Sequence, residues 1–254
     1  MTIMMILGIA VLVIILAIWV RSIERDSIFY PVRGISTTPL EAGLEYEDVY
    51  FNAQDNVLLN GWYIPPEEEG YTVLLCHGNG GNIGDRVEKA IILNDLGLGV
   101  FLFDYRGYGR SRGVPSEEGL YADAEAAYEY LTAKKKIVPE KIVVYGESLG
   151  APVAVRLAAR SKAAGLVTEG GFTSVKDMAA IMYPLMPGPL LSSKFDTKAM
   201  IKDVRIPKLI MHSRYDDIVP FSMAEEIFRE AGAPKTFIEL KGRHNMAFQD
   251  SGKA

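Results

Sequence analysis

Short apolar runs alternate along this chain with longer stretches that have the spacing of amphipathic helices. Runs that are apolar along their whole length are typical of strands buried on both faces. We therefore predict an α/β fold with a mostly parallel central sheet and helices on both of its faces. The expected strands are Thr72–Cys76, Gly99–Asp104, Lys141–Tyr145, Gly165–Thr168, Lys208–Met211 and Thr236–Leu240, and the expected helices are Asp85–Leu96, Ser116–Lys134, a helix after Ser148, and Ser222–Glu230.

Two further strands, Tyr46–Phe51 and Val57–Ile64, precede this pattern, and a turn-rich loop at Asn52–Asn56 separates them. The short connection predicts an antiparallel hairpin at the amino-terminal end of the domain. We take residues 45–254 as one domain, because a chain of this length normally builds a single core.

The beginning of the chain has a different character. From Ile3 to Val20, eighteen consecutive residues carry no polar side chain. As a helix this run is about 27 Å long, close to the roughly 30 Å hydrocarbon core of a bilayer. A cleaved signal peptide normally has a basic segment ahead of a shorter apolar run and small residues at its cleavage site. No Lys or Arg precedes the run and Ala17–Val20 offers no such site. We predict that residues 1–20 are a transmembrane anchor, rather than a signal peptide or a buried core helix.

The next segment, residues 21–44, contains two prolines and two glycines, so we expect a poorly structured tether between anchor and domain. Arg21, Arg25 and Arg33 follow the apolar run. Because basic residues favour the cytosolic side of a membrane span, we expect a single-pass membrane protein whose domain faces the cytosol.

The charge balance argues against a nucleic-acid partner. Lys and Arg number 27, Asp and Glu number 32, and the net charge is -5, whereas nucleic-acid-binding domains are usually basic. The single cysteine, Cys76, allows no internal disulfide, and no Cys/His cluster has the spacing of a zinc site. We expect neither a metal nor an organic cofactor.

The segment Phe172–Val204 interrupts the alternation of strands and helices. It holds methionines at helical spacing and a cluster of prolines, among them Met186 and Pro187. Ligands of parallel α/β sheets bind at the carboxyl ends of the strands. We predict a short helical excursion over that edge, in the position of a small lid. The alternative is a surface loop that has no role in substrate binding.

The sequence Gly146-Glu147-Ser148-Leu149-Gly150 lies directly between a predicted strand and a predicted helix. In such a turn the serine has a strained backbone and an exposed hydroxyl, and the flanking glycines leave room that a Cβ would fill. We predict that Ser148 is a catalytic nucleophile. A tight structural turn is the alternative.

A nucleophilic serine needs a general base, and the chain has three histidines: His77, His212 and His244. In serine sites built on a turn of this kind, the acid follows the serine in the chain and the histidine comes last. This order selects His244. We expect His77 to shape its glycine-rich loop and His212 to be structural.

The catalytic acid must accept the second imidazole hydrogen and hold the ring in the useful tautomer. Asp216 and Asp217 follow the strand at Lys208–Met211, and Glu169 follows another strand. We prefer Asp216, with Asp217 and Glu169 as alternatives. Glu169 has a second interpretation, as a structural carboxylate below the site.

The negative charge of a tetrahedral intermediate requires amide donors. One is expected from the backbone N–H of Leu149, which follows the nucleophile, and a second from Asn79 in the glycine-rich loop after Cys76. That loop lacks the lysine and the spacing of a phosphate-binding loop. We expect Cys76 to be a buried thiol and not a nucleophile.

A second glycine-bearing turn, Asp104–Ser111, also follows a strand. We interpret this turn as structural. The alternative is that Tyr105 or Arg106 lines the substrate pocket.

Taken together, several of these motifs resemble, in order and spacing, those of the α/β-hydrolase superfamily. Within it the chain resembles the Bem46 and ABHD-like branch, whose members often have one amino-terminal anchor. The resemblance extends over residues 28–248 and implies Ser148 as nucleophile, Asp216 as acid and His244 as base. The segments that carry it are His77–Asn82, Asp104–Gly109, Gly146–Gly150, Phe172–Ser174, Asp216–Pro220 and His244–Asn245.

The chain departs from the branch at two places. Ala151-Pro152 stands where a further glycine is common, and this puts the packing beside the nucleophile in question. Few residues follow His244, which leaves little chain for the usual final helix.

These observations predict a membrane-anchored serine hydrolase that cleaves carboxylic esters or thioesters through an acyl-enzyme. A lipid or a lipidated protein is the expected substrate class, because the domain would lie beside a bilayer. A serine peptidase of the same fold is the nearest alternative. A non-catalytic anchored interaction domain is the alternative from another functional class.

Overall fold

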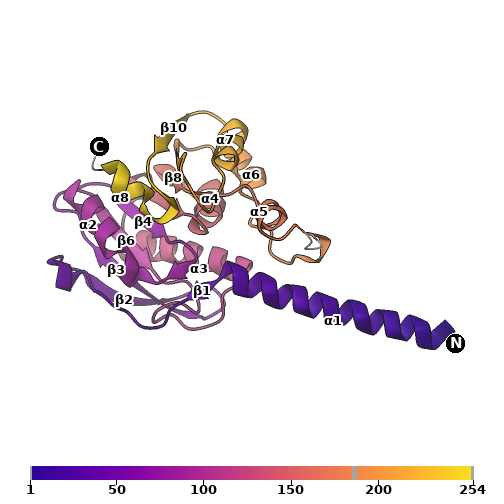
Figure 1. The fold of residues 1–254 in the computed structure, drawn as a ribbon. Helices are drawn as coiled ribbons and strands as arrows, with labels where there is room; N and C mark the ends of the chain where they lie inside the picture. The colour runs from indigo at the N-terminus through magenta and orange to yellow at the C-terminus, as the bar shows by residue number, and fades with distance from the viewer. Residues whose placement is uncertain (1, 185–187, 253–254) are drawn as a thin grey trace.

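A twisted eight-stranded sheet forms the centre of the molecule in the computed structural model, which describes residues 2–184 and 188–252 (Figure 1). Its strand order is β10-β9-β8-β7-β4-β6-β3-β2. The strands are β2 (Glu47–Asn52), β3 (Leu58–Ile64), β4 (Thr72–Cys76), β6 (Gly99–Phe103), β7 (Ile142–Glu147), β8 (Gly165–Glu169), β9 (Lys208–Ser213) and β10 (Lys235–Leu240).

The sheet is mostly parallel, as predicted. Strand β3 pairs antiparallel with both of its neighbours, β2 and β6, and the other pairings are parallel. The β2–β3 pairing, in which Asn52 lies opposite Leu58, is the predicted amino-terminal hairpin. The carboxyl ends of β7, β8 and β9 therefore lie at one edge of the sheet, where ligands of such sheets bind.

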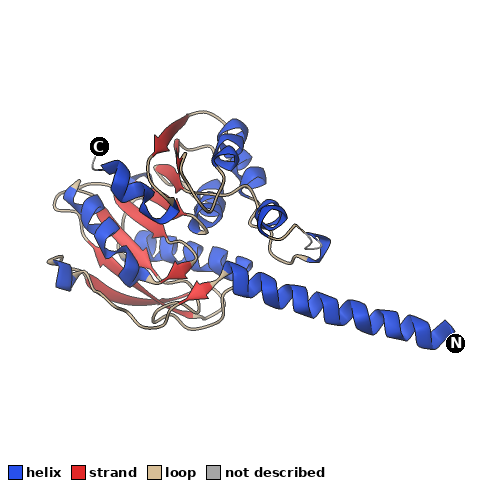
Figure 2. Ribbon diagram, in the orientation of Figure 1, coloured by secondary structure: helices blue, strands red, loops and turns tan. Residues whose placement is uncertain are grey.

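Helices cover both faces of the sheet, as Figure 2 shows. Because side chains alternate across a strand, Leu74 packs in the layer that holds α3, α4 and α7, while Val73 and Leu75 pack in the layer that holds α2 and α8. The helices are α1 (Thr2–Ile28), α2 (Val87–Asp95), α3 (Glu117–Glu129, continued by one π-helical turn to Lys134), α4 (Gly150–Arg160), α5 (Val175–Met182), α6 (Thr197–Met200), α7 (Phe221–Glu230) and α8 (Ala247–Gly252).

Helix α1 projects from the body as a long single helix (Figure 1). Its segment Met5–Ile28 is long and apolar enough to cross a membrane, a property that anchors share with signal sequences. The helix continues eight residues beyond Val20, so the expectation of a poorly structured tether directly after residue 20 is wrong. Val20 and Glu24 are four residues apart and therefore lie on the same face of the helix, and this face is buried against the body.

The chain stays ordered after α1. Strand β1 (Tyr30–Pro31) pairs in parallel with β5 (Gly80–Gly81), which lies in the glycine-rich loop after β4. The segment that follows α1 is thus built into the domain, because its backbone pairs with that of a loop about fifty residues further along the chain.

The excursion between β8 and β9 contains α5, a 3₁₀ turn at Gly188–Leu190 and α6. Met186 and Pro187 lie outside the described residues. The residues after His244 include the short helix α8.

Candidate active site

Ser148 stands at the turn between β7 and α4, where its backbone has a positive φ of 50°. Its amide donates a hydrogen bond of 2.8 Å to the carbonyl of Glu169 on the neighbouring strand. A Cβ at Gly146 would lie 2.4 Å from the carbonyl oxygen of Gly150, and one at Gly150 would lie 1.9 Å from that of Cys76. Both glycines are therefore required sterically, as the motif predicts.

Ala151, the departure from the branch pattern, fits beside Ser148 because of a second glycine. The Ala151 side chain is fully buried. A Cβ at Gly171 would lie 2.8 Å from that of Ala151. Gly171, on the loop after β8, thus leaves the space that the Ala151 methyl group needs. Pro152 falls in the first turn of α4, where a proline costs no hydrogen bond.

A continuous hydrogen-bond chain joins three side chains from separate loops. His244 Nε2 lies 2.9 Å from Ser148 Oγ, and His244 Nδ1 lies 2.6 Å from Asp216 Oδ2. The His244 and Asp216 side chains are 6% and 2% exposed. The ring nitrogens of one imidazole therefore connect a hydroxyl to a buried carboxylate, which is the arrangement that removes a proton from a serine.

The structure separates the three candidate acids. Asp217 accepts the backbone N–H of His244 instead of a ring hydrogen, and Glu169 lies in a separate ion-pair network. Burial raises the pKa of Asp216, but the hydrogen bond from His244 and the amides of Val219 and Ile218 outweigh it and hold that pKa below its usual value. Asp216 is therefore ionised at neutral pH and orients His244.

His212 lies next to this chain without joining it. Its Nε2 donates to the carbonyl of Val219 at 2.9 Å and lies 3.4 Å from Asp216 Oδ2. Burial lowers the pKa of His212. The ring is thus neutral and positions the loop that carries the acid, in agreement with the predicted structural role.

Asn79 and Leu149, the expected amide donors, line the same pocket as Ser148. The carbonyl of Asn79 accepts hydrogen bonds from the backbone N–H of Tyr30 and from the hydroxyl of Tyr108, at 3.0 and 2.8 Å. Because two donors hold this peptide, the loop that carries the Asn79 amide is preorganised.

His77 is buried inside the same loop. Its Nδ1 donates to the carbonyl of Gly78 at 2.7 Å, and its ring packs 4.4 Å from that of Tyr105. Burial lowers the pKa of His77 to about 3. A neutral ring held in this way shapes the loop, as predicted, and has no contact with Ser148 Oγ among the hydrogen bonds of the described residues.

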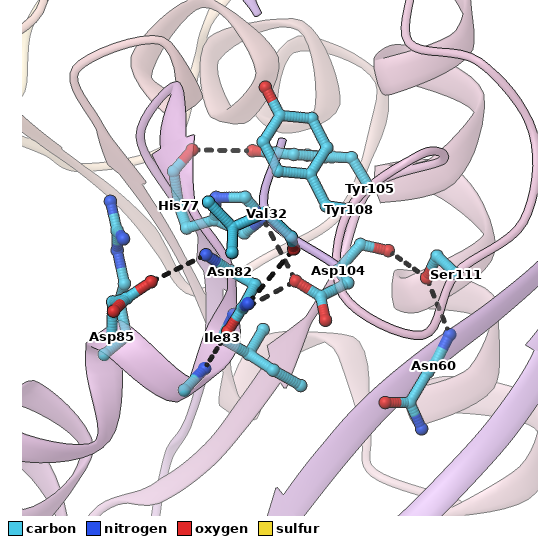
Figure 3. A network of polar contacts seen from close by, with 12 residues as sticks. Val32, Asn60, His77, Asn82, Ile83, Asp85, Asp104, Tyr105, Tyr108 and Ser111 are labelled. Atoms are coloured by element: carbon cyan, nitrogen blue, oxygen red, sulfur yellow. Dashed lines mark hydrogen bonds and ion pairs between the residues drawn. The ribbon is translucent and has the colours of Figure 1, made fainter. Parts of the chain in front are cut away.

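Figure 3 shows how the glycine-rich loop is held to the turn Asp104–Ser111. The Asp104 carboxylate accepts the amide of Ile83 at 3.0 Å, and the Asp104 carbonyl accepts the Ser111 hydroxyl at 2.6 Å. Asn82 donates to the carbonyl of Val32, just after β1. The turn is therefore structural. Neither Tyr105 nor Arg106 is among the residues that line the pocket at Ser148.

An apolar cavity of about 320 Å³ opens beside Ser148. This volume lies in the range of small-molecule sites. One wall of the cavity comes from α5. Another comes from the last turns of α1, and the sequence did not predict that α1 would contribute to this site. The lining residues are Ile23, Glu24, Ser27, Ile28, Tyr30, Asn79, Ser148, Leu149, Phe172, Val175, Met178, Ala179, Met182, Tyr183, Leu191, Ile218 and Val219.

Comparisons with known proteins agree with this architecture. A family model described as serine aminopeptidase, S33, matches residues 67–196. Protein bem46 of Schizosaccharomyces pombe is 35% identical over 210 residues, which cover 78% of this chain and 70% of that protein. An uncharacterised protein of Mycobacterium tuberculosis is 40% identical over 235 residues, which cover 90% of this chain and 82% of that protein. The chain belongs to the α/β-hydrolase family, in its Bem46-like branch.

The fold of this Bem46-like hydrolase is shared with solved esterases. An esterase of Pyrococcus furiosus superposes with a TM-score of 0.73 at 21% identity, covering 87% of this chain and 92% of that one. A likeness at this identity concerns the fold, and the chemistry must be argued from the residues of the site.

An ion-pair network that the sequence did not predict lies below the turn that carries Ser148. Lys89 Nζ lies 2.7 Å from Glu147 Oε2 and 2.7 Å from Glu169 Oε2, and Arg86 contacts Glu147 at 3.0 Å. Burial raises the pKa of Glu147, but the charges of Lys89 and Arg86 outweigh it and hold that pKa well below its usual value. Two residues signalled it in the sequence: Glu169, interpreted there as a structural carboxylate below the site, and Glu147, a charge between a buried strand and Ser148, which requires a partner.

Cys76 is buried as predicted, and burial raises the pKa of its thiol to about 12, so it is no nucleophile. Among the described residues, no group of three or more His, Cys, Asp and Glu side chains is arranged to hold a metal ion.

Proposed function

We propose that this protein is a membrane-anchored serine hydrolase that cleaves carboxylic esters or thioesters. The observation that carries the proposal is the hydrogen-bond chain from Ser148 through His244 to Asp216, placed at an apolar cavity. The hydrolase family and its esterase-like fold support hydrolytic chemistry in general.

The geometry supports an acyl-enzyme mechanism. Ser148 Oγ attacks the acyl carbonyl while His244 Nε2 takes its proton, and Asp216 stabilises the imidazolium. The oxyanion receives the amide hydrogens of Leu149 and Asn79. His244 then protonates the departing alcohol or thiol, and activates a water molecule that releases the acid and restores Ser148.

The anchoring role of α1 rests on two features. The helix is exposed and apolar from Met5 to Trp19, apart from one half-buried alanine, over the residues whose side chains are described. Without a break it then docks on the body through the buried Glu24. Ala17–Val20, at the end of the apolar run, does not have the small residues of a signal-peptide cleavage site, which favours an anchor that is retained. The basic residues after Val20 favour a cytosolic domain, and nearby acylated lipids or lipidated proteins are the proposed substrates.

A serine peptidase is the second candidate, because the matching family model is described as an aminopeptidase. An aminopeptidase must bind a free α-ammonium group, which calls for an available carboxylate. Of the pocket-lining residues, Glu24 alone carries a carboxylate. Both of its oxygens already accept hydrogen bonds, from Ser192 and Ser193. The pocket therefore favours an apolar acyl group.

Labelling with a fluorescent fluorophosphonate tests the proposal on the full chain in detergent. We expect labelling of the wild type and of Ser161→Ala, a serine at the other end of α4, and none of Ser148→Ala. p-Nitrophenyl esters and amino-acid p-nitroanilides then compare esterase with peptidase activity.

Two results would contradict the proposal. Labelling that persists in Ser148→Ala would refute the nucleophile. A folded wild type that is neither labelled nor active on any ester would favour a non-catalytic interaction domain.

A further inference from the structure

The last two turns of α1 form part of the wall of the cavity at Ser148. Ile23, Ser27 and Ile28 line it from α1, and Met178 and Met182 line it from α5. A helix that served only as a membrane tether would not need to line the cavity that contains Ser148. The same helix therefore has two parts, an exposed apolar part and a part built into the site.

Polar contacts hold the docked part of α1 in place. The Glu24 carboxylate accepts hydrogen bonds from the backbone N–H and the hydroxyl of Ser192, at 2.8 and 2.9 Å, and from the amide of Ser193. Ser27 Oγ lies 3.2 Å from the hydroxyl of Tyr183, which follows α5. The helix is thus attached to the excursion on the opposite side of the cavity, and the two walls form one unit.

The cavity lies close to the point where α1 leaves the body. Ile23 is three residues beyond Val20, the end of the apolar run, which corresponds to about 4.5 Å along a helix axis. Arg21 and Arg25 are exposed there, as expected of residues at a membrane surface. On α5, Ile181 and Met182 are 53% and 54% exposed. Figure 1 shows α5 on the side of the body from which α1 projects.

We propose that the last two turns of α1 and helix α5 form an acyl-binding site, which takes the single long acyl chain of an ester or thioester directly from the bilayer. Ile23 and Ser27 set the length of chain that the cavity accepts in front of Ser148. The chain enters the apolar cavity from the hydrocarbon core at the point where α1 reaches the body. The inference rests on the proposed hydrolase function for its reaction and on the cavity for its ligand.

The position of α1 also bears on the oxyanion donors. The residue after Phe29, Tyr30, donates its amide to the carbonyl of Asn79 at 3.0 Å, and Tyr30–Pro31 pairs with Gly80–Gly81. Val32 accepts a hydrogen bond from Asn82 (Figure 3). The acyl site and the amide that receives the oxyanion are therefore joined through the segment that follows α1.

The test places a large side chain in the cavity. Ile23→Trp in the full chain occupies the α1 wall, and Ile23→Ala enlarges it. Ile18→Trp is the matched control, because Ile18 lies on the same helix, is 63% exposed and does not line the cavity. Circular dichroism of every variant, and fluorophosphonate labelling of those that retain Ser148, show that the protein and the site are folded.

The first measurement is independent of catalysis. Binding of the fluorescent fatty acid cis-parinaric acid is titrated in phosphatidylcholine vesicles with Ser148→Ala as the parent. We expect Ile23→Trp to weaken binding at least tenfold and Ile18→Trp to leave it unchanged. Each buried methylene contributes about fourfold in affinity, so loss of two or three methylenes is sufficient for this effect.

The second measurement uses p-nitrophenyl acetate, octanoate and palmitate. With Ile23→Trp, kcat/KM for palmitate should fall at least tenfold more than that for acetate, and Ile23→Ala should shift the preferred chain length upward. Mono-oleoyl glycerol and an S-oleoyl peptide in the same vesicles distinguish a lipid from a protein source. Hydrolysis of either that depends on position 23 supports the site.

Three outcomes decide the inference. Equal losses on acetate and palmitate would overturn it, as would fatty-acid binding that Ile23→Trp leaves unchanged. If the wild type hydrolyses no ester but binds the fatty acid in a manner that depends on Ile23, the acyl site stands and the proposed hydrolase function fails.

Discussion

Lys89→Met removes the ammonium group that bridges Glu147 and Glu169 below the turn that carries Ser148. The Lys89 ammonium lies 2.7 Å from each of Glu147 and Glu169, and its side chain is 7% exposed. Breaking a buried pair by removing one partner costs about 3–5 kcal/mol, because the remaining charge stays buried without its partner. At about 2–4 °C per kcal/mol for a domain of this size, the Tm should fall by about 6–20 °C.

The effect should depend on pH in a defined direction. In the wild type the pKa of Glu147 is lowered, so the stability that this group contributes is present above the unfolded pKa of about 4.3 and is lost as the pH falls. In Lys89→Met the burial of Glu147, which raises its pKa, is still offset by Arg86 but no longer by Lys89, so the pKa of Glu147 is higher than in the wild type and the variant gains less stability as the pH rises above that value. The difference in Tm between the two proteins should therefore be largest near neutral pH and should shrink toward pH 4.

Thermal unfolding of the full chain in detergent, followed by circular dichroism from pH 4 to pH 8, measures this difference. Lys198→Met is the matched control. Lys198 forms an ion pair with Glu226 at 2.6 Å, but both side chains are more than a third exposed, so we expect no resolvable change. The reasoning is refuted if Lys89→Met behaves like this control, or if its effect is the same at pH 4 and pH 7.

Two further predictions concern the surroundings of His244 and of Ser148. Asp216→Asn should lower kcat for an ester about 10³- to 10⁴-fold by removing the group that orients the imidazole, while Asp217→Asn, which affects a backbone contact, should stay within about threefold; similar losses in steady-state assays would contradict the assignment. Gly171→Ala should lower the free energy of unfolding by about 1–3 kcal/mol, because the added methyl group overpacks against Ala151, and Ala151→Gly in the same chain should restore most of that stability. Urea unfolding of the wild type, the two single variants and the double variant measures the coupling, and additive effects would show that the two side chains do not meet.

Residues near one another in the chain were predicted well. The alternation of strands and helices, the hairpin at β2 and β3, and the steric need for Gly146 follow from side-chain periodicity and from the geometry of one tight turn. These features depend on neighbours within a few positions, so a pattern in the sequence contains most of the information. The apolar character of α1 follows in the same way.

Other features were left with alternatives or were mispredicted because they depend on packing between distant segments. Asp216 and Asp217 are adjacent and chemically equal, and the direction of the backbone after β9 decides which carboxylate reaches the His244 ring. The tether was mispredicted because the prediction relied on the prolines and glycines of residues 21–44. The docking of α1 onto the body, which keeps the chain helical to Ile28, leaves no local pattern in the sequence.

The sequence by itself determined the order of the elements, the serine turn and an apolar helix at the amino terminus, because each depends on local spacing and composition. Only the tertiary structure decided that Lys89 bridges Glu147 and Glu169, and that Ile23 lies at the cavity beside Ser148. The physical reason is that these contacts join residues more than fifty positions apart, whose distances are set by how the helices pack on the sheet.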